Sequence, residues 1–328
     1  MTEISHLPEK FGLKEGAEAF PLMVVVSTTY VCNARCPNCP YTDSEIRKDY
    51  SDAPFIKPEI FKKIADECGA NDSYIRITGG GEPLLHPQMI DLIGYAKKVG
   101  CKIGLITNGS LLTPDKTDRL LSAGTDVIEI SADAADEQTY SKVRKGLDFN
   151  TLVSNVRYLV NKRNQMKSKT KVVVSVVNQE AVKDKLTDIV KYWEKIVDKV
   201  QVRKYLTWGL LKEKSGDPTP YLPVRVSCPF PFERLNIDTR GKIEFCGFDI
   251  AGETDFGNVM KTTIQSVWTG KRFSTWRRLI LEGKYEEIPI CKKCTDWKYR
   301  SWKYNYWKVV KDAERSRKNK LGGSTLLP

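Results

Sequence analysis

Short apolar segments alternate with helix-like segments along the chain from about residue 22 to residue 205. We predict six strands, at 22–27, 74–78, 102–107, 127–131, 171–177 and 200–205. Two of the intervening helices are followed by a glycine, Gly100 and Gly124, where glycine commonly ends a helix. Strands that alternate with helices indicate parallel βαβ units. The sequence therefore predicts an α/β fold in which helices cover the outer face of a parallel sheet.

Polar and glycine-rich segments follow the ends of the first four predicted strands. They are the cysteine-rich loop 32–39, the segment 78–83, the segment 107–109 and the segment 131–133. In folds built from parallel strands and covering helices, functional residues gather at the carboxyl ends of the strands. We therefore expect one functional site at this end of the sheet.

The cysteine-rich loop contains Cys32, Cys36 and Cys39 in the spacing C-x3-C-x2-C. Three thiolates on one short loop can hold a cubane iron–sulfur cluster, which normally takes four cysteines, and leave one iron open. An open coordination position is typical of catalytic metal sites. A partial zinc site is the alternative, but the nearest residues for a fourth ligand, Cys68 and His86, lie in other segments.

Together with Gly80, Gly81 and Glu82 after the second strand, this loop resembles the defining motif of the radical SAM superfamily. The resemblance implies a partial (β/α)6 TIM-like barrel and a [4Fe–4S] cluster on the three cysteines. It also implies that the open iron binds the amino and carboxylate groups of S-adenosylmethionine. One electron then cleaves this cofactor to a 5′-deoxyadenosyl radical, which takes a hydrogen atom from the substrate. Glu82 is placed by the resemblance near the methionine amine.

Three further residues match cofactor-binding positions of related enzymes. Ser131 and Arg144 match positions that bind the ribose or carboxylate of the cofactor, and Asn108 is a weaker match. A helix cap and a surface arginine are the alternatives for the first two. The family often has an aromatic residue just before the third cysteine, where this chain has Asn38, so we expect contacts to adenine either from Tyr41 or from the fifth strand near Val176.

Four later cysteines, Cys228, Cys246, Cys291 and Cys294, form a second group. The run C-x12-G-x4-C followed by C-x2-C resembles the SPASM/Twitch extension of radical SAM enzymes. It implies one fully ligated auxiliary [4Fe–4S] cluster that transfers electrons. A four-cysteine zinc site is the alternative that the spacing alone leaves open. We predict a β-hairpin at 235–246 and a helix at 264–281 in this small C-terminal domain.

The domain boundaries follow from these patterns. We predict an N-terminal extension (1–20), the partial barrel (21–207), a linker (208–227), the auxiliary-cluster domain of hairpin and helices (228–296), and a basic aromatic C-terminal helix and tail (297–328). The formal net charge is +12, and the C-terminal stretch mixes aromatic and cationic residues. We interpret that stretch as a packed helix rather than a nucleic-acid site, although such interleaving can bind bases by stacking.

Other features bear on the compartment. The first 14 residues are polar and lack the apolar core of a signal peptide, and no run of 18 apolar residues is present. Nine cysteines in such a chain do not indicate a disulfide framework, and we expect the remaining two, Cys68 and Cys101, to be buried thiols. We therefore expect a cytoplasmic protein that does not enter a membrane.

The substrate is the least constrained part of the prediction. Arg203, Lys204 and Trp208 follow the sixth strand and are candidates to line the substrate space. The weak candidates for catalytic groups are Tyr30, Glu233 and Asp238.

We expect a radical SAM oxidoreductase that acts on a small polar molecule such as a sugar, an aminocyclitol or a nucleotide-linked sugar, with net oxidation. Its other expected partner is an electron donor such as flavodoxin or ferredoxin. A peptide-modifying radical enzyme is one alternative, and a non-catalytic iron–sulfur or zinc module is the other.

Overall fold

The computed structural model describes residues 16–78, 80–208, 225, 227–250, 252, 254–299 and 310–317. The predicted N-terminal extension up to residue 15, most of the predicted linker and most of the C-terminal stretch lie outside these residues. Within the described part of the chain, no helix is both long enough and apolar enough to cross a membrane.

Eight strands form one sheet. They are β1 (Met23–Ser27), β2 (Tyr74–Thr78), β3 (Lys102–Thr107), β4 (Val127–Ser131), β5 (Lys171–Asn178), β6 (Lys199–Lys204), β7 (Arg234–Ile237) and β8 (Ile243–Glu244). Their order across the sheet is β6-β5-β4-β3-β2-β1-β7-β8, and every neighbouring pair is parallel except β7 and β8. The predicted α/β class with a parallel sheet is confirmed.

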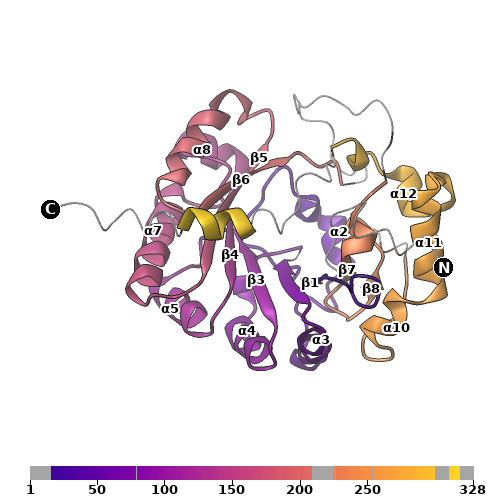
Figure 1. Cartoon of the computed structure of the whole chain (residues 1–328). Coiled ribbons are helices and arrows are strands. Elements are labelled where there is room, and N and C mark those ends of the chain that lie inside the picture. Colours follow the sequence, from indigo (N-terminus) through magenta and orange to yellow (C-terminus); the bar gives the residue numbers. More distant parts are fainter. Residues whose placement is uncertain are drawn as a thin grey trace.

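Helices pack on the outer face of this sheet (Figure 1). The longer ones are α3 (Pro58–Ala70), α4 (Met89–Lys98), α5 (Pro114–Ser122), α6 (Glu137–Val143), α7 (Phe149–Gln165) and α8 (Leu186–Glu194). Side chains set where several of them begin: Thr113, Asp136 and Asp148 each accept a hydrogen bond from a backbone N–H of the first turn. Gly100 and Gly124 follow helices in the left-handed conformation, as the sequence predicts.

The predicted hairpin is present as β7 and β8, but its first strand also extends the barrel sheet. β7 lies parallel to β1, with Val25 opposite Asn236. The four residues of β7 are all buried. The auxiliary-cluster domain therefore shares the sheet with the barrel instead of packing beside it as a separate layer.

Beyond the hairpin lie α9 (Phe230–Glu233), α10 (Ile264–Trp268), α11 (Lys271–Leu281) and α12 (Pro289–Lys293), and the last three gather beside β8 (Figure 1). The sequence predicts one helix over 264–281, whereas the structure has two. Gly270 separates them, and a Cβ atom there would lie 2.8 Å from the backbone oxygen of Ser266. The chain turns at this glycine, so the rings of Phe273 and Trp268 pack against each other at a tilt of 43°, with centroids 5.3 Å apart.

The amino-terminal end of the barrel is covered by the helical residues 310–317. Ala313 is fully buried against the first residues of several strands, among them Met23, Tyr74 and Val127, and Val310 packs on the same cluster. Covering this end leaves the carboxyl ends of the strands, where the predicted site residues lie, as the accessible end of the barrel.

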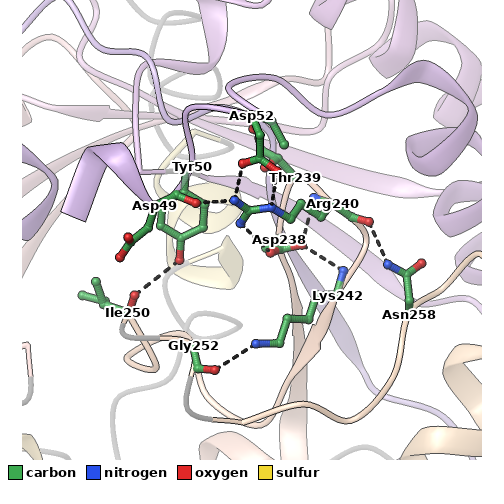
Figure 2. A network of polar contacts seen from close by, with 11 residues as sticks. Asp49, Tyr50, Asp52, Asp238, Thr239, Arg240, Lys242, Ile250, Gly252 and Asn258 are labelled. Carbon is green, nitrogen blue, oxygen red and sulfur yellow. Dashed lines mark hydrogen bonds and ion pairs between the residues drawn. The ribbon is translucent and has the colours of Figure 1, made fainter. Parts of the chain in front are cut away.

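A polar network ties the hairpin turn to the segment after the cysteine-rich loop (Figure 2). Arg240 donates to the backbone oxygen of Asp49 and pairs with the carboxylate of Asp52. Thr239 donates to the backbone oxygen of Ala53 over 2.7 Å. Residues 49–53 follow the cysteine-rich loop in the sequence, after one short α-helix. These contacts therefore hold the hairpin turn, in the second half of the chain, against the first half.

Candidate functional site

A cavity of about 790 Å³ opens at the carboxyl ends of the strands. It is lined by residues from β1 round to β7, so the sheet curves around it as a partial barrel. The predicted site residues on its wall are Cys32, Cys36, Cys39, Gly80, Gly81, Glu82, Asn108, Ser131, Arg144 and Glu233. Residues far apart in the sequence are thus brought to one site.

The cysteine-rich loop is held in place by side chains that follow β3 and by a backbone oxygen that follows α6. The amide nitrogen Nδ2 of Asn108 donates to Oδ1 of Asn33 over 2.9 Å, and Asn33 donates in turn to Ser110. The backbone N–H of Arg35 donates to the oxygen of Lys145 over 2.8 Å. Asn108 therefore positions the loop, in addition to facing the cavity.

Glycine is needed where the segment that follows β2 crosses this loop. A Cβ atom on Gly81 would lie 2.0 Å from the backbone oxygen of Val31, and one on Gly80 would lie 2.1 Å from the ring of Tyr30. The backbone N–H of Glu82 donates to the same oxygen of Val31 over 2.8 Å. The two glycines therefore let the segment after β2 pack directly on Tyr30 and Val31, the two residues before Cys32.

The Glu82 carboxylate is buried and satisfied from within the protein. It accepts hydrogen bonds from the Thr107 hydroxyl and from the backbone N–H of Asn108, each over 2.7 Å. Burial raises the pKa of Glu82, and these donors act in the opposite direction. The carboxylate is thus fixed in orientation at the cavity wall.

Burial raises the pKa of two thiols on the loop, those of Cys32 and Cys39. Burial raises the pKa of the Cys39 thiol to about 11, and the neighbouring thiols of Cys36 and Cys32 add to the rise. Arg144 approaches the Cys36 sulfur at 3.6 Å and pairs with Asp133 at 2.7 Å. Three crowded thiols become thiolates when a positively charged metal group binds them, as in a cysteine-ligated cluster.

Two family models match separate parts of the chain. The model of the radical SAM superfamily matches residues 26–189, which is half of the chain. This chain belongs to the radical SAM superfamily. A second model, described as an iron-sulfur cluster-binding domain, matches residues 228–295.

Curated relatives cover different shares of this radical SAM protein. An AdoMet-dependent heme synthase of Methanosarcina barkeri is 29% identical over 38% of this chain and 34% of its own length, so the chain spans about a third of that relative. A cofactor-modifying protein for the tungsten-containing aldehyde ferredoxin oxidoreductase of Pyrococcus furiosus is 24% identical over 80% of this chain and 84% of its own.

Solved structures share the fold. BtrN in complex with AdoMet and 2-DOIA matches with a TM-score of 0.56 and 18% identity, over 83% of this chain and 92% of that one. Streptococcus suis SuiB bound to S-adenosylmethionine matches with a TM-score of 0.65 and 15% identity, over 89% of this chain and 73% of that one.

Membership of this family means that the chain binds S-adenosylmethionine and a [4Fe–4S] cluster, and the second domain binds auxiliary iron–sulfur. The residues present fit the [4Fe–4S] cluster and S-adenosylmethionine, because the three cysteines of the loop line one cavity together with Gly80, Gly81 and Glu82. All nine cysteines are free, and Cys68 and Cys101 are buried thiols away from both groups, as predicted.

The second cysteine group is also assembled in space. Cys228, Cys246, Cys291 and Cys294 are half-buried. Burial raises the pKa of the Cys291 thiol, and the thiols of Cys246, Cys228 and Cys294 each raise it further. Among the described residues, no three His, Cys, Asp or Glu side chains converge on the position of a single metal ion. A [4Fe–4S] cluster takes four cysteine thiolates, and this group supplies four cysteines.

The three candidate catalytic residues have different surroundings. Tyr30 stacks on Tyr50 with ring centroids 3.5 Å apart, under Gly80. The Asp238 carboxylate accepts from two backbone N–H groups of the hairpin turn, those of Arg240 and Lys242. Neither Tyr30 nor Asp238 is part of the cavity wall, whereas Glu233, which pairs with Arg234, is.

The inner wall of the cavity carries a charge cluster that the sequence analysis missed. Glu129 on β4 is fully buried and pairs with Arg76 at 2.9 Å and with Arg203. Burial alone would raise the pKa of Glu129, but the charges of Arg203 and Arg76 outweigh it and lower the pKa to about 2. Arg76 and Glu129 are each the one charged residue of their strand, a pattern that indicates an inward-facing polar group.

The predicted substrate-side residues Arg203, Lys204 and Trp208 all line the cavity. The indole N–H of Trp208 donates to the backbone oxygen of Asn38 over 3.1 Å, beside the third cysteine. Tyr41 lines the cavity as well. The rings of Trp208 and Tyr41 therefore lie near Asn38, the position at which the family often has an aromatic residue.

Proposed function

We propose that this radical SAM enzyme removes a hydrogen atom from a small polar substrate, of the sugar, aminocyclitol or nucleotide-linked sugar type, and that the auxiliary cluster accepts the electron that follows. The observation that carries the proposal is the extent of the cavity. Its wall runs from Cys32, Cys36 and Cys39 to Pro229 and Gly247, which adjoin cysteines of the second group.

A substrate in this cavity is thus within reach of both cysteine groups. Phe248, two residues after Cys246, lines the cavity and contacts Trp208 with ring centroids 5.1 Å apart. Trp208 in turn donates to Asn38 of the cysteine-rich loop. The two groups are therefore linked along the wall of one cavity, which supports a shared role in a single reaction.

The size of the cavity favours a small substrate. Small-molecule sites commonly measure about 300–1,000 Å³. The 790 Å³ here must hold S-adenosylmethionine and the substrate together. The remaining space suits a molecule of about the size of a sugar better than an extended peptide.

Each part of the wall has a separate task in this proposal. When bound, the cluster and S-adenosylmethionine supply a 5′-deoxyadenosyl radical that can take hydrogen from an unactivated carbon. Glu82 orients the amino group of the methionine moiety, while Arg144 offsets the negative charge of the thiolates. Net oxidation requires the substrate to lose one further electron and one proton, and Glu233 is the carboxylate on the cavity wall nearest in sequence to the second cysteine group.

A substrate screen tests the proposal. The anaerobically reconstituted protein should contain about eight irons per chain. We expect hydroxylated sugar-type molecules to stimulate formation of 5′-deoxyadenosine, and deuterium placed on the attacked carbon to appear in that product. Stimulation by peptides instead of sugars would assign the enzyme to peptide modification, and no cleavage of the cofactor with any reductant would contradict an enzymatic role altogether.

The remaining partners follow from the same chemistry. We propose a flavodoxin or ferredoxin as the electron donor, because reductive cleavage consumes one electron at a low potential. We also propose a cytoplasmic location, supported by nine cysteines that form no disulfide with one another.

A further inference from the structure

Two amide side chains on the cavity wall each have one buried atom without a hydrogen-bond partner among the described residues. Gln201 on β6 is 7% exposed and Asn236 on β7 is 6% exposed, and both line the cavity. Within the described residues, nothing hydrogen-bonds to the buried Oε1 of Gln201 or the buried Nδ2 of Asn236. The two strands lie toward opposite ends of the sheet, so the amides face one space from two sides.

Leaving such groups unpaired is costly. A buried polar atom without a partner loses the hydrogen bonds it makes with water, and the large majority of buried side-chain polar atoms are therefore paired. An amide that stands unpaired in a cavity is better explained by a ligand that completes it. The argument holds if the amide oxygen and nitrogen are exchanged, because a hydroxyl group both donates and accepts hydrogen bonds.

The surroundings of the two amides are polar. Gln201 lies opposite Ser175 of β5, which also lines the cavity. The amide of Asn236 lies against Gly247, where a Cβ atom would come within 2.8 Å of its oxygen. A ligand bound to Asn236 is therefore next to the residue that follows Cys246.

The charge cluster on the same wall adds a preference for charge. Glu129 neutralises one of its two partners, Arg76 and Arg203, so this cluster carries one net positive charge. The Arg203 side chain keeps 30% of its surface exposed and lines the cavity. In a site of low dielectric constant, that charge favours an anionic group on the ligand and disfavours a cationic one.

We propose that Gln201 and Asn236 bind the hydroxyl groups of a polyhydroxylated substrate that also carries one anionic group, a carboxylate or a phosphate, near Arg203. This inference rests on the proposed function and narrows its substrate class to acidic sugars and sugar phosphates. It excludes cationic aminocyclitols as preferred substrates.

The first test compares four hexoses that differ in charge. D-Glucuronate, D-glucose 6-phosphate, D-glucose and D-glucosamine are titrated into the reconstituted protein with S-adenosylmethionine and no reductant, and binding is followed calorimetrically. We expect one or both anionic hexoses to bind at least tenfold more tightly than the neutral and the cationic one. The glucuronate and phosphate arms separate the two sources of the charge. Equal affinities, tighter binding of glucosamine or no binding of any hexose overturns the proposal.

The second test uses Gln201→Leu and Asn236→Leu, with Gln179→Leu as a matched control. Gln179 is also 7% exposed and also has a buried, unpaired amide atom within the described chain, but it does not line the cavity. We expect all three variants to unfold without ligand at or above the wild-type temperature, because each replaces an unpaired polar group. Only the first two should bind the anionic hexose at least tenfold more weakly.

Two results would count against these roles. A large fall in unfolding temperature of the ligand-free Gln201→Leu and Asn236→Leu proteins would mean that the amides serve the fold. Equal loss of binding in the control would mean that the effect is indirect. Binding is measured without reductant, so it is independent of cofactor cleavage: stimulation of 5′-deoxyadenosine by a neutral or cationic hexose overturns this inference alone, whereas absent cleavage overturns only the proposed function.

Discussion

Replacing Gly81 with alanine tests how closely the glycine segment and the cysteine-rich loop are packed. The added methyl group would lie 2.0 Å from the backbone oxygen of Val31, whereas ordinary contacts begin near 3.4 Å. The oxygen belongs to the backbone of Val31, so it cannot rotate away as the end of a flexible side chain could. The segment that carries Gly81 and the cysteine-rich loop must therefore separate by on the order of 1 Å.

The cost can be estimated from two contributions. Overpacking costs about 1–3 kcal/mol, and loss of the hydrogen bond from Glu82 to Val31 adds about 1 kcal/mol. Because Val31 precedes Cys32, the movement displaces the thiols. We expect Gly81→Ala to retain about four of about eight irons after reconstitution and to lose most cleavage of S-adenosylmethionine.

Gly94→Ala is the control. Gly94 lies within α4 and has no atom within 4 Å of an added Cβ, so alanine there should stabilise the protein by about 0.5–1 kcal/mol. Iron content, sulfide content and 5′-deoxyadenosine are measured for both variants. If Gly81→Ala keeps the wild-type iron content and cleavage rate, the close packing described here is refuted.

Three other predictions concern the supports of the site. Asn108→Ala removes one hydrogen bond of the Asn33 side chain. We expect a marked fall in the rate of cofactor cleavage, measured by product formation, with only a small fall in the unfolding temperature. Glu129→Gln should lower the free energy of unfolding by about 3 kcal/mol at pH 7, since the pKa of Glu129 is lowered from 4.5 to about 2. The stabilisation by the ionised carboxylate is present above about pH 4.5 and is lost as the pH falls toward 2. The difference in unfolding free energy between variant and wild type, followed by tryptophan fluorescence, should therefore shrink over that interval. Arg240→Ala should loosen the hairpin turn from 49–53, and because its pairing with exposed Asp52 is screened by salt, the difference in unfolding temperature should narrow as ionic strength rises.

The local features of this protein were predictable, because they depend on neighbours in sequence. The six barrel strands follow from apolar segments closed by turns, and the cysteine-rich loop follows from its spacing. Gly80 and Gly81 were predicted to allow close approach to a ligand; the structure shows that they also make room for Tyr30 and Val31.

The features that were missed depend on distant parts of the chain. The alternation of polar and apolar residues in 234–237 predicts a strand, but it does not show whether that strand pairs only with its hairpin partner or also with β1. The pairing of Arg76, Glu129 and Arg203 joins three strands, so no single segment reveals it. Local signals were available at Gly270, since glycine inside a helix is unfavourable, and at Arg76 and Glu129, each the one charged residue of its strand.

The central claim is that Cys32, Cys36 and Cys39 hold the cluster that cleaves S-adenosylmethionine, while the four later cysteines hold a second one. The most direct measurement is the iron content and 5′-deoxyadenosine yield of the variant with all three replaced by alanine. The account predicts about four irons, bound by the second group, and no reductive cleavage. A triple variant that still forms 5′-deoxyadenosine would contradict it.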